Sequence, residues 1–150
     1  MDTTFEFDDT FKHEIILQVP FYMTDYGGGV YHSRYLDLYQ QARDAFFTDA
    51  GFPYKDLMAK NFYIVIVDIH AAYKKAVNFF EDIMIRTRLA GVEDKSFFMV
   101  QEMWRKNGEG ETLCNRLEVT HVCVTPERKA VSIPDFFIEK LIAFQKGTGA

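Results

Sequence analysis

Residues 21–51 read FYMTDYGGGVYHSRYLDLYQQARDAFFTDAG, and this stretch decides the fold. Behind an acid and three glycines, apolar residues recur at spacings of three and four, as they do on the buried face of a helix. Gly51 stands where a left-handed residue ends many helices. The pattern predicts one long helix over residues 33–50, roughly 27 Å in length at about 1.5 Å per residue. Its expected buried stripe is Tyr35, Leu38, Tyr39, Ala42, Ala45 and Phe46.

The start of this helix is a candidate site. The first turn of a helix has backbone N–H groups without intrahelical partners, and its positive dipole end attracts negative charge. Just upstream, Gly27–Gly29 let the backbone take positive φ and let a ligand approach it closely. Asp25 precedes these glycines, and a carboxylate beside free N–H groups suits acyl transfer, since it can attack or activate water while they stabilise an oxyanion. The alternative is that Asp25 only caps a flexible turn.

The length and composition fit a single domain over residues 1–150. A chain of 17.5 kDa can bury a real core, and no linker, repeat or low-complexity tract divides it. The 15 Phe and 8 Tyr residues are a heavy aromatic load. Such residues can pack a core, and they can also line a pocket for an apolar or aromatic ligand.

The charge balance excludes nucleic acid as a partner. The net charge of −5 and the pI near 5.3 leave no surplus of Lys and Arg for a phosphate backbone. There is no apolar run long enough to span a membrane, and the first ten residues are acidic where a signal peptide is basic and then apolar. We therefore expect a cytoplasmic protein, in which Cys114 and Cys123, too far apart on one extended segment to bridge, are buried free thiols.

The rest of the chain predicts an antiparallel sheet. Strands are expected over residues 12–19, 62–73, 83–91, 96–105, 112–124 and 130–133, with a helical turn at 54–59 and a last helix from Pro134 to 144. This is an α+β pattern, and the only surface large enough to bury the long helix is the sheet wrapped around it. The apolar, β-branched segment 62–73 is expected to be covered on both faces, with a second subunit on its outer side.

No metal site is predicted. The four histidines, His13, His32, His70 and His121, show no ligand spacing, and the chain has no CxxC or HExxH motif. We expect His70 and His121, which fall within strands, to be packed residues with a hydrogen-bonded nitrogen.

Residues 25–32, DYGGGVYH, followed by YL at 35–36 and AR at 42–43, resemble the signature of the hotdog-fold acyl-CoA thioesterases of the 4-hydroxybenzoyl-CoA thioesterase-like family. In that signature an acid, two residues and a glycine precede a hydrophobic and aromatic or His turn into the central helix. The resemblance is weaker over residues 73–76, 95–96, 122–126 and 133–134, and it spans most of the chain.

The resemblance implies a hotdog fold, with an antiparallel sheet wrapped around one long helix. It also implies a homodimer joined through sheet edges, often paired into a homotetramer, with active sites at the dimer interface. The substrate would be an acyl-CoA, hydrolysed to the free acid and CoA with no cofactor beyond the CoA that it carries. Asp25 would be the nucleophile or the general base, the His32 amide would polarise the thioester carbonyl, and the His32 imidazole could orient water. The substrate would approach over Gly28, Gly29, Val30 and Tyr31.

For the phosphates of CoA the sequence offers Lys74, Lys75, Lys95, Ser96 and Arg128, all at expected strand ends or turns. Glu93 and Asp94 depart from the family, whose members tend to be basic there. Three alternatives to acyl-CoA hydrolysis stay open: hydrolysis of an acyl-carrier-protein thioester, a non-catalytic hotdog protein that binds acyl thioesters, and a hotdog hydratase or dehydratase.

Overall fold

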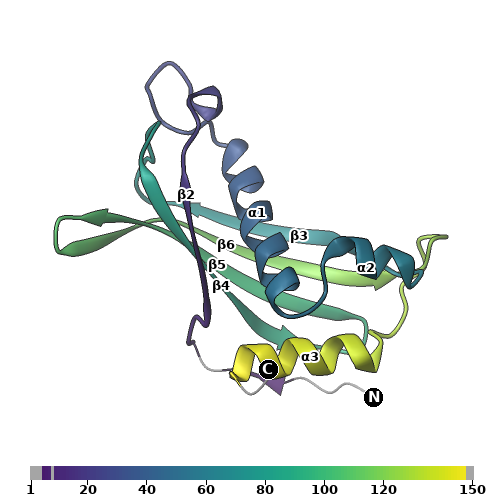
Figure 1. Cartoon of the computed structure of the whole chain (residues 1–150). Coiled ribbons are helices and arrows are strands. Elements are labelled where there is room, and N and C mark those ends of the chain that lie inside the picture. The colour runs from purple at the N-terminus through teal and green to yellow at the C-terminus, as the bar shows by residue number, and fades with distance from the viewer. Residues whose placement is uncertain (1–4, 8, 148–150) are drawn as a thin grey trace.

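A computed structural model describes residues 5–7 and 9–147 (Figure 1). Its strands form one six-stranded sheet in the order β1-β4-β5-β6-β3, with β2 also paired to β4, and all pairings are antiparallel. The strands are β1 (Phe5–Glu6), β2 (His13–Gln18), β3 (Tyr63–Tyr73), β4 (Asp82–Val92), β5 (Ser96–Asn107) and β6 (Gly110–Val124). The predicted meander of long strands is confirmed.

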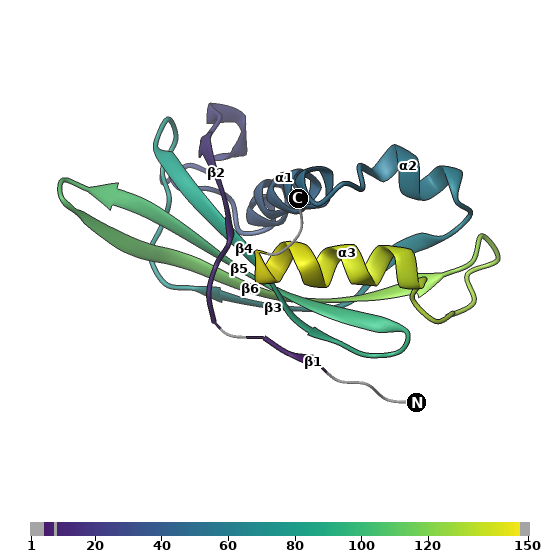
Figure 2. The same cartoon turned by 60° about the horizontal axis from the view of Figure 1, so that its bottom comes forward.

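Three α-helices and one short 3₁₀-helix complete the fold. They are η1 (Phe21–Met23), α1 (Arg34–Asp49), α2 (Tyr54–Ala59) and α3 (Asp135–Lys146). Figure 2 shows α1 and α3 on the same face of the sheet, and the rings of Phe46 and Phe144 meet between them at 5.0 Å. The long helix ends where it was predicted to, because Gly51 takes a φ of +100° just after it.

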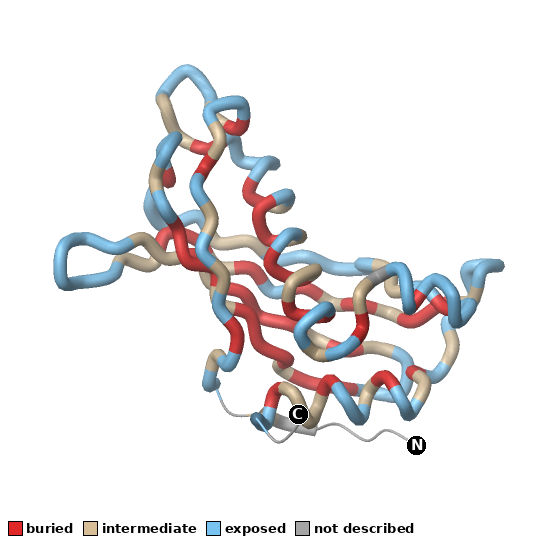
Figure 3. Tube along the Cα trace, viewed as in Figure 1, coloured by how far each residue is buried: buried red, intermediate tan, exposed pale blue. Residues whose placement is uncertain are grey.

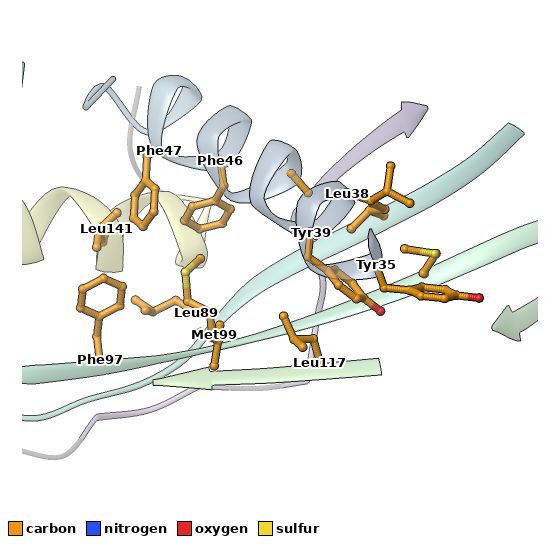
Figure 4. Close-up of a cluster of buried hydrophobic side chains, with 14 of the residues drawn as sticks. Tyr35, Leu38, Tyr39, Phe46, Phe47, Leu89, Phe97, Met99, Leu117 and Leu141 are labelled. Carbon is orange, nitrogen blue, oxygen red and sulfur yellow. The ribbon is translucent and has the colours of Figure 1, made fainter. Parts of the chain in front are cut away.

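The core lies between α1 and the sheet. The helix buries Tyr35, Leu38, Tyr39, Phe46 and Phe47. In Figure 4 Phe46 and Phe47 point from the helix towards Leu89, Met99 and Leu141, and Tyr39 points towards Leu117. The stripe read from the sequence is therefore buried except for Ala45, which is half-buried, and Phe47 joins it. Burial of each large apolar side chain contributes roughly 1.5–3 kcal/mol.

A polar seam runs through this apolar core. The Tyr39 hydroxyl donates to Asn115 Oδ1 at 2.8 Å, and buried Arg43 donates to Gln101 Oε1 at 2.8 Å. Gln101 Nε2 in turn donates to the Tyr39 carbonyl at 3.1 Å and to Thr87 Oγ1 at 3.0 Å. These bonds tie the middle of α1 to the central strands, since a buried polar group is costly unless it is paired.

The two strand histidines have different outcomes. His121 is packed as predicted: it is 1% exposed and stacks on Phe97 at 4.7 Å. The hydrogen bond expected for it is absent, since neither ring nitrogen has a partner among the described residues. Burial, with a smaller effect from Arg43, lowers the pKa of His121 to about 3. His70 is exposed on β3, so its expected packing is wrong.

Strand β3 is the edge of the sheet. The sequence predicted cover on both of its faces, with a second subunit on the outer side, and one chain alone does not cover both faces. One side of it pairs with β6, and among the described strands nothing pairs with the other side. Ile66, Val67 and Ile69 are 41%, 58% and 39% exposed, and β3 is largely pale blue in Figure 3. Its apolar composition therefore belongs to an open edge, which natural proteins normally cover.

The segment before α3 forms no strand. Residues 130–133 make one isolated bridge, between Ala130 and Val124, and are otherwise held by the β4–β5 turn. There Asp94 accepts hydrogen bonds from the Ile133 N–H at 2.8 Å and from the Ser132 hydroxyl at 3.0 Å. Asp94 thus has a structural role, and α3 follows Pro134 as predicted.

Candidate active site

The glycine turn is a tight, closed loop. The Asp25 N–H donates to the Gly29 carbonyl at 2.9 Å, and the Gly28 N–H donates to the Asp25 carbonyl at 3.1 Å. Gly28 has a φ of +83°, a conformation that side chains disfavour. The Gly27 N–H donates to Asp25 Oδ1 at 2.8 Å. Asp25 therefore does cap its turn, through one oxygen, while its Oδ2 has no hydrogen-bond partner among the described residues.

Neighbouring segments hold this turn in place. The Val30 N–H donates to the Val77 carbonyl at 2.7 Å, and the Tyr31 N–H donates to the Met23 carbonyl at 2.8 Å. Helix α1 begins at once: the Arg34 N–H donates to the Tyr31 carbonyl at 2.8 Å. The N–H of His32 has no acceptor in the described part of the chain, so an N–H group is available at the positive end of the helix.

A cavity of about 330 Å³ opens between the glycine turn, the start of α1 and the end of β3. It is lined by Asp25, Val30, Tyr31, His32, Tyr35, Tyr73, Lys74, Lys75 and Ala76. Six of the residues singled out from the sequence therefore meet here, and Gly28 and Gly29 shape the same turn without lining the cavity. An acidic residue, a residue just before the long helix and two lysines therefore line one space.

Two lining tyrosines were not recognised as site residues from the sequence. Tyr35 was assigned only to the buried stripe of the helix, and Tyr73 only to the end of a strand. The Tyr73 hydroxyl donates to the His32 carbonyl at 2.7 Å, and the Tyr35 hydroxyl accepts from the Val77 N–H at 3.2 Å. Burial raises the pKa of Tyr35, so this hydroxyl stays protonated. The sequence feature that could have assigned Tyr73 to the site is its position directly before the two lysines.

Lys74 and Lys75 stand at the rim of the cavity. Their backbone N–H groups both donate to the Cys114 carbonyl at 2.9 Å, which fixes the chain as it leaves β3. Both residues are exposed, and neither ammonium group forms an ion pair within the described residues. Their charge is therefore available to an anion.

The other residues expected to bind CoA lie elsewhere in the chain. Met103 of β5 lies level with the cavity, because it pairs with Asn115, which pairs with Tyr73. Ser96 stands at the other end of β5, about 23 Å from Met103 at about 3.3 Å per residue. Lys95 sits in the same β4–β5 turn, and the Ser96 hydroxyl donates to Glu93 at 3.2 Å. Arg128 lines a second cavity, of about 390 Å³, beside Tyr63. Within one chain these three residues do not join Asp25, because their turns fall at the opposite end of the sheet.

The sequence profile of the Thioesterase-like superfamily matches residues 19–141. The chain belongs to this superfamily. The acyl-CoA thioester hydrolase YbgC of Escherichia coli O6:H1 is 31% identical over 103 residues, which span 69% of this chain and 75% of that protein. The predicted family and enzyme class, thioester hydrolase, are confirmed at this level.

Solved structures confirm the hotdog fold. The 1,4-dihydroxy-2-naphthoyl-CoA thioesterase from Synechocystis superposes with a TM-score of 0.78 at 18% identity, over 87% of this chain and 95% of that one. A 4-hydroxybenzoyl CoA thioesterase variant complexed with 4-hydroxybenzoyl CoA gives 0.79 at 20% identity, over 85% and 96%. Within the described residues, no helix is long and apolar enough to cross a membrane.

Proposed function

We propose that this protein hydrolyses an acyl-CoA thioester to the free acid and CoA, with Asp25 as the reacting carboxylate. The observation that carries this proposal is the cavity in which Asp25 meets the N-terminus of α1. Membership of the thioesterase superfamily supports the reaction class. A thioester is activated enough for one carboxylate and one oxyanion site to suffice, without a cofactor.

The turn prepares Asp25 for this chemistry. The Gly27 N–H holds Oδ1, which leaves Oδ2 for the reaction. As a nucleophile, Oδ2 attacks the thioester carbon and the C–S bond breaks, which releases CoA as a thiolate. Water then hydrolyses the resulting anhydride to the free acid and the Asp25 carboxylate, and a proton from this water goes to the thiolate. As a general base, Oδ2 takes a proton from an attacking water, the C–S bond breaks, and the thiolate receives that proton. In both routes the N–H of His32 stabilises the oxyanion, and the proposal leaves the choice between them open.

Lys74 and Lys75 are the proposed contacts to the CoA phosphates. Ammonium groups form charge-assisted hydrogen bonds with phosphate oxygens, and these two stand at the cavity rim in an otherwise acidic protein. An acyl-carrier-protein thioester has the same pantetheine arm but lacks the nucleotide. The lysines therefore favour CoA over the carrier protein as the thiol component.

We further propose a homodimer formed through the open edge of β3. Antiparallel pairing of β3 with its copy, about a two-fold axis near residue 68, would place residue 63 of one subunit beside residue 73 of the other. The Arg128 cavity of one subunit would then lie next to the Asp25 cavity of its partner, with Lys95 and Ser96 two strands further inward. This arrangement explains why Arg128 is remote from Asp25 within one chain. A homotetramer of two such dimers is the larger assembly that the family resemblance implies.

The proposed reaction is tested by thiol release from a panel of short, long and aromatic acyl-CoAs, with acyl-carrier-protein thioesters in parallel. The proposal expects CoA release from at least one acyl-CoA class and slower release from the carrier protein. Tight acyl-CoA binding without turnover would instead identify a non-catalytic binding protein. Faster turnover of the carrier-protein thioester would overturn the assignment of CoA.

A further inference from the structure

We propose that Tyr73 is a positioning residue for the hydrolysis proposed above, on which this inference rests. Its hydroxyl holds the backbone of His32 so that the His32 N–H, just before α1, faces the thioester. Tyr73 is the last residue of β3, and its hydroxyl donates to the His32 carbonyl at 2.7 Å. Both residues line the cavity that contains Asp25. A side chain of the sheet edge is thus bonded to the backbone at the proposed oxyanion site.

The His32 carbonyl needs a partner because of where it lies. A carbonyl oxygen carries partial negative charge, and this one belongs to the residue whose N–H would stabilise the oxyanion. Left unpaired at the cavity, it would be free to rotate towards the developing negative charge. The hydrogen bond from Tyr73 satisfies the oxygen and fixes the orientation of the peptide group that joins His32 to Ser33, directly after the His32 N–H.

The helix itself supplies little restraint at this point. Ser33, the N-cap residue, has helical dihedral angles and makes no side-chain capping bond. A Ser in this position ordinarily bonds an N–H of the first turn and thereby orders it. The Arg34 N–H is bonded to the Tyr31 carbonyl at 2.8 Å, and the His32 N–H just before it has no acceptor in the described part of the chain. Further restraint on the backbone here comes from outside the helix, through Tyr73.

Tyr73 is 53% exposed, and one face of the site orients its ring. Its ring packs edge-on against Tyr35 with centroids 5.3 Å apart and planes at 88°. Tyr35 is 4% exposed, and its hydroxyl accepts from the Val77 N–H. The Val77 carbonyl in turn accepts from the Val30 N–H at 2.7 Å. One connected set of contacts therefore joins the glycine turn, the start of α1 and the end of β3.

Such a residue acts on the transition state more than on the bound substrate, because the oxyanion forms only as the reaction proceeds. In Tyr73→Phe the ring contact with Tyr35 is kept and only the hydrogen bond is lost. We expect kcat to fall about tenfold, the effect of roughly one misaligned hydrogen bond, with KM for acyl-CoA within about twofold of its original value.

Two CoA analogues separate positioning from a merely structural role. A thioether analogue imitates the bound substrate. A trifluoromethyl ketone analogue adds water to give a tetrahedral hydrate, which imitates the tetrahedral intermediate. Tyr73→Phe should weaken binding of the ketone about tenfold, the same factor as kcat, and leave thioether binding unchanged. Tyr22→Phe is the matched control, since Tyr22 lies at the same end of the molecule and is 71% exposed. It should change neither affinity.

The outcomes are distinct. Equal weakening of both analogues, or an unchanged kcat in Tyr73→Phe, would overturn the positioning role while leaving the proposed hydrolysis intact. Absence of thiol release by the unmodified protein would overturn the hydrolysis, and this inference with it. A selective loss of ketone affinity that parallels kcat would establish the role of Tyr73.

Discussion

The Gly27 N–H donates to Asp25 Oδ1 at 2.8 Å, so the proposed reacting carboxylate is fixed by the backbone of its own turn. This turn depends on Gly28, whose φ is +83°. We expect Gly28→Ala to cost about 1 kcal/mol of stability and to lower kcat by more than tenfold, because the strained turn moves the carboxylate.

A matched control for this variant exists in the β5–β6 hairpin. Gly108 has a φ of +61°, and a Cβ there would meet nothing within 4 Å. Gly108→Ala should lose a similar amount of stability in thermal unfolding while keeping its thiol-release rate. Equal activity of the two variants would show that turn geometry does not control the carboxylate.

His121 predicts a pH dependence of stability. Its pKa is lowered to about 3 in the folded chain, first by burial and then by Arg43, against about 6.5 when unfolded. Between these values the unfolded chain binds more protons, so stability falls as pH falls, by about 1.4 kcal/mol per pH unit. The contribution of His121 to stability is fully present above about pH 6.5. The free energy of unfolding, measured with urea between pH 4.5 and 7, should depend less steeply on pH in His121→Leu, by this amount per pH unit. An unchanged dependence on pH would refute the assignment of this effect to His121.

The open edge of β3 predicts a dimer that can be broken by charge. In Val67→Lys, two ammonium groups would meet close to the proposed two-fold axis, where like charges opposed across paired strands are unfavourable. Analytical ultracentrifugation should find monomers, with thiol release reduced because each site needs the other subunit. Ile16→Lys, at a 64% exposed position of β2, should remain dimeric. A dimeric, fully active Val67→Lys protein would contradict this interface.

The two lysines at the rim predict an effect on substrate binding alone. Replacing Lys74 and Lys75 together by Ala should raise KM for acyl-CoA about tenfold at low salt and leave kcat within twofold, since phosphate contacts do not change during the reaction. The same acyl group on pantetheine, which lacks the nucleotide, should show no change in KM. A similar rise in KM for both substrates would show that the lysines do not bind the phosphates.

Local patterns in the sequence identified the parts of the structure that depend on near neighbours. The periodic stripe and Gly51 predicted α1, and the turn that joins Asp25 to the helix is formed by adjacent residues. Tyr73 could not be assigned to the site in this way, because its meeting with His32 depends on a contact across 41 positions of the chain.

Composition also did not place the apolar strand β3 within the sheet. β3 has the β-branched residues of a strand covered on both faces, but it lies at the sheet edge. Likewise, the charges of Lys95 and Arg128 indicated exposed turns without indicating which end of the sheet would carry them. Such placement follows from strand order, and strand order is a property of the whole chain.

The most direct test of the central claim compares Asp25→Asn with Asp56→Asn, a change at an exposed residue of α2. Asn at position 25 can still accept the Gly27 N–H, so the turn should persist, but its amide can neither attack a thioester nor take a proton from water. With acyl-CoA the first variant should lose at least about a thousandfold in thiol-release rate, and the second should match the unmodified protein. Substantial activity in Asp25→Asn would contradict the assignment of Asp25 as the reacting carboxylate.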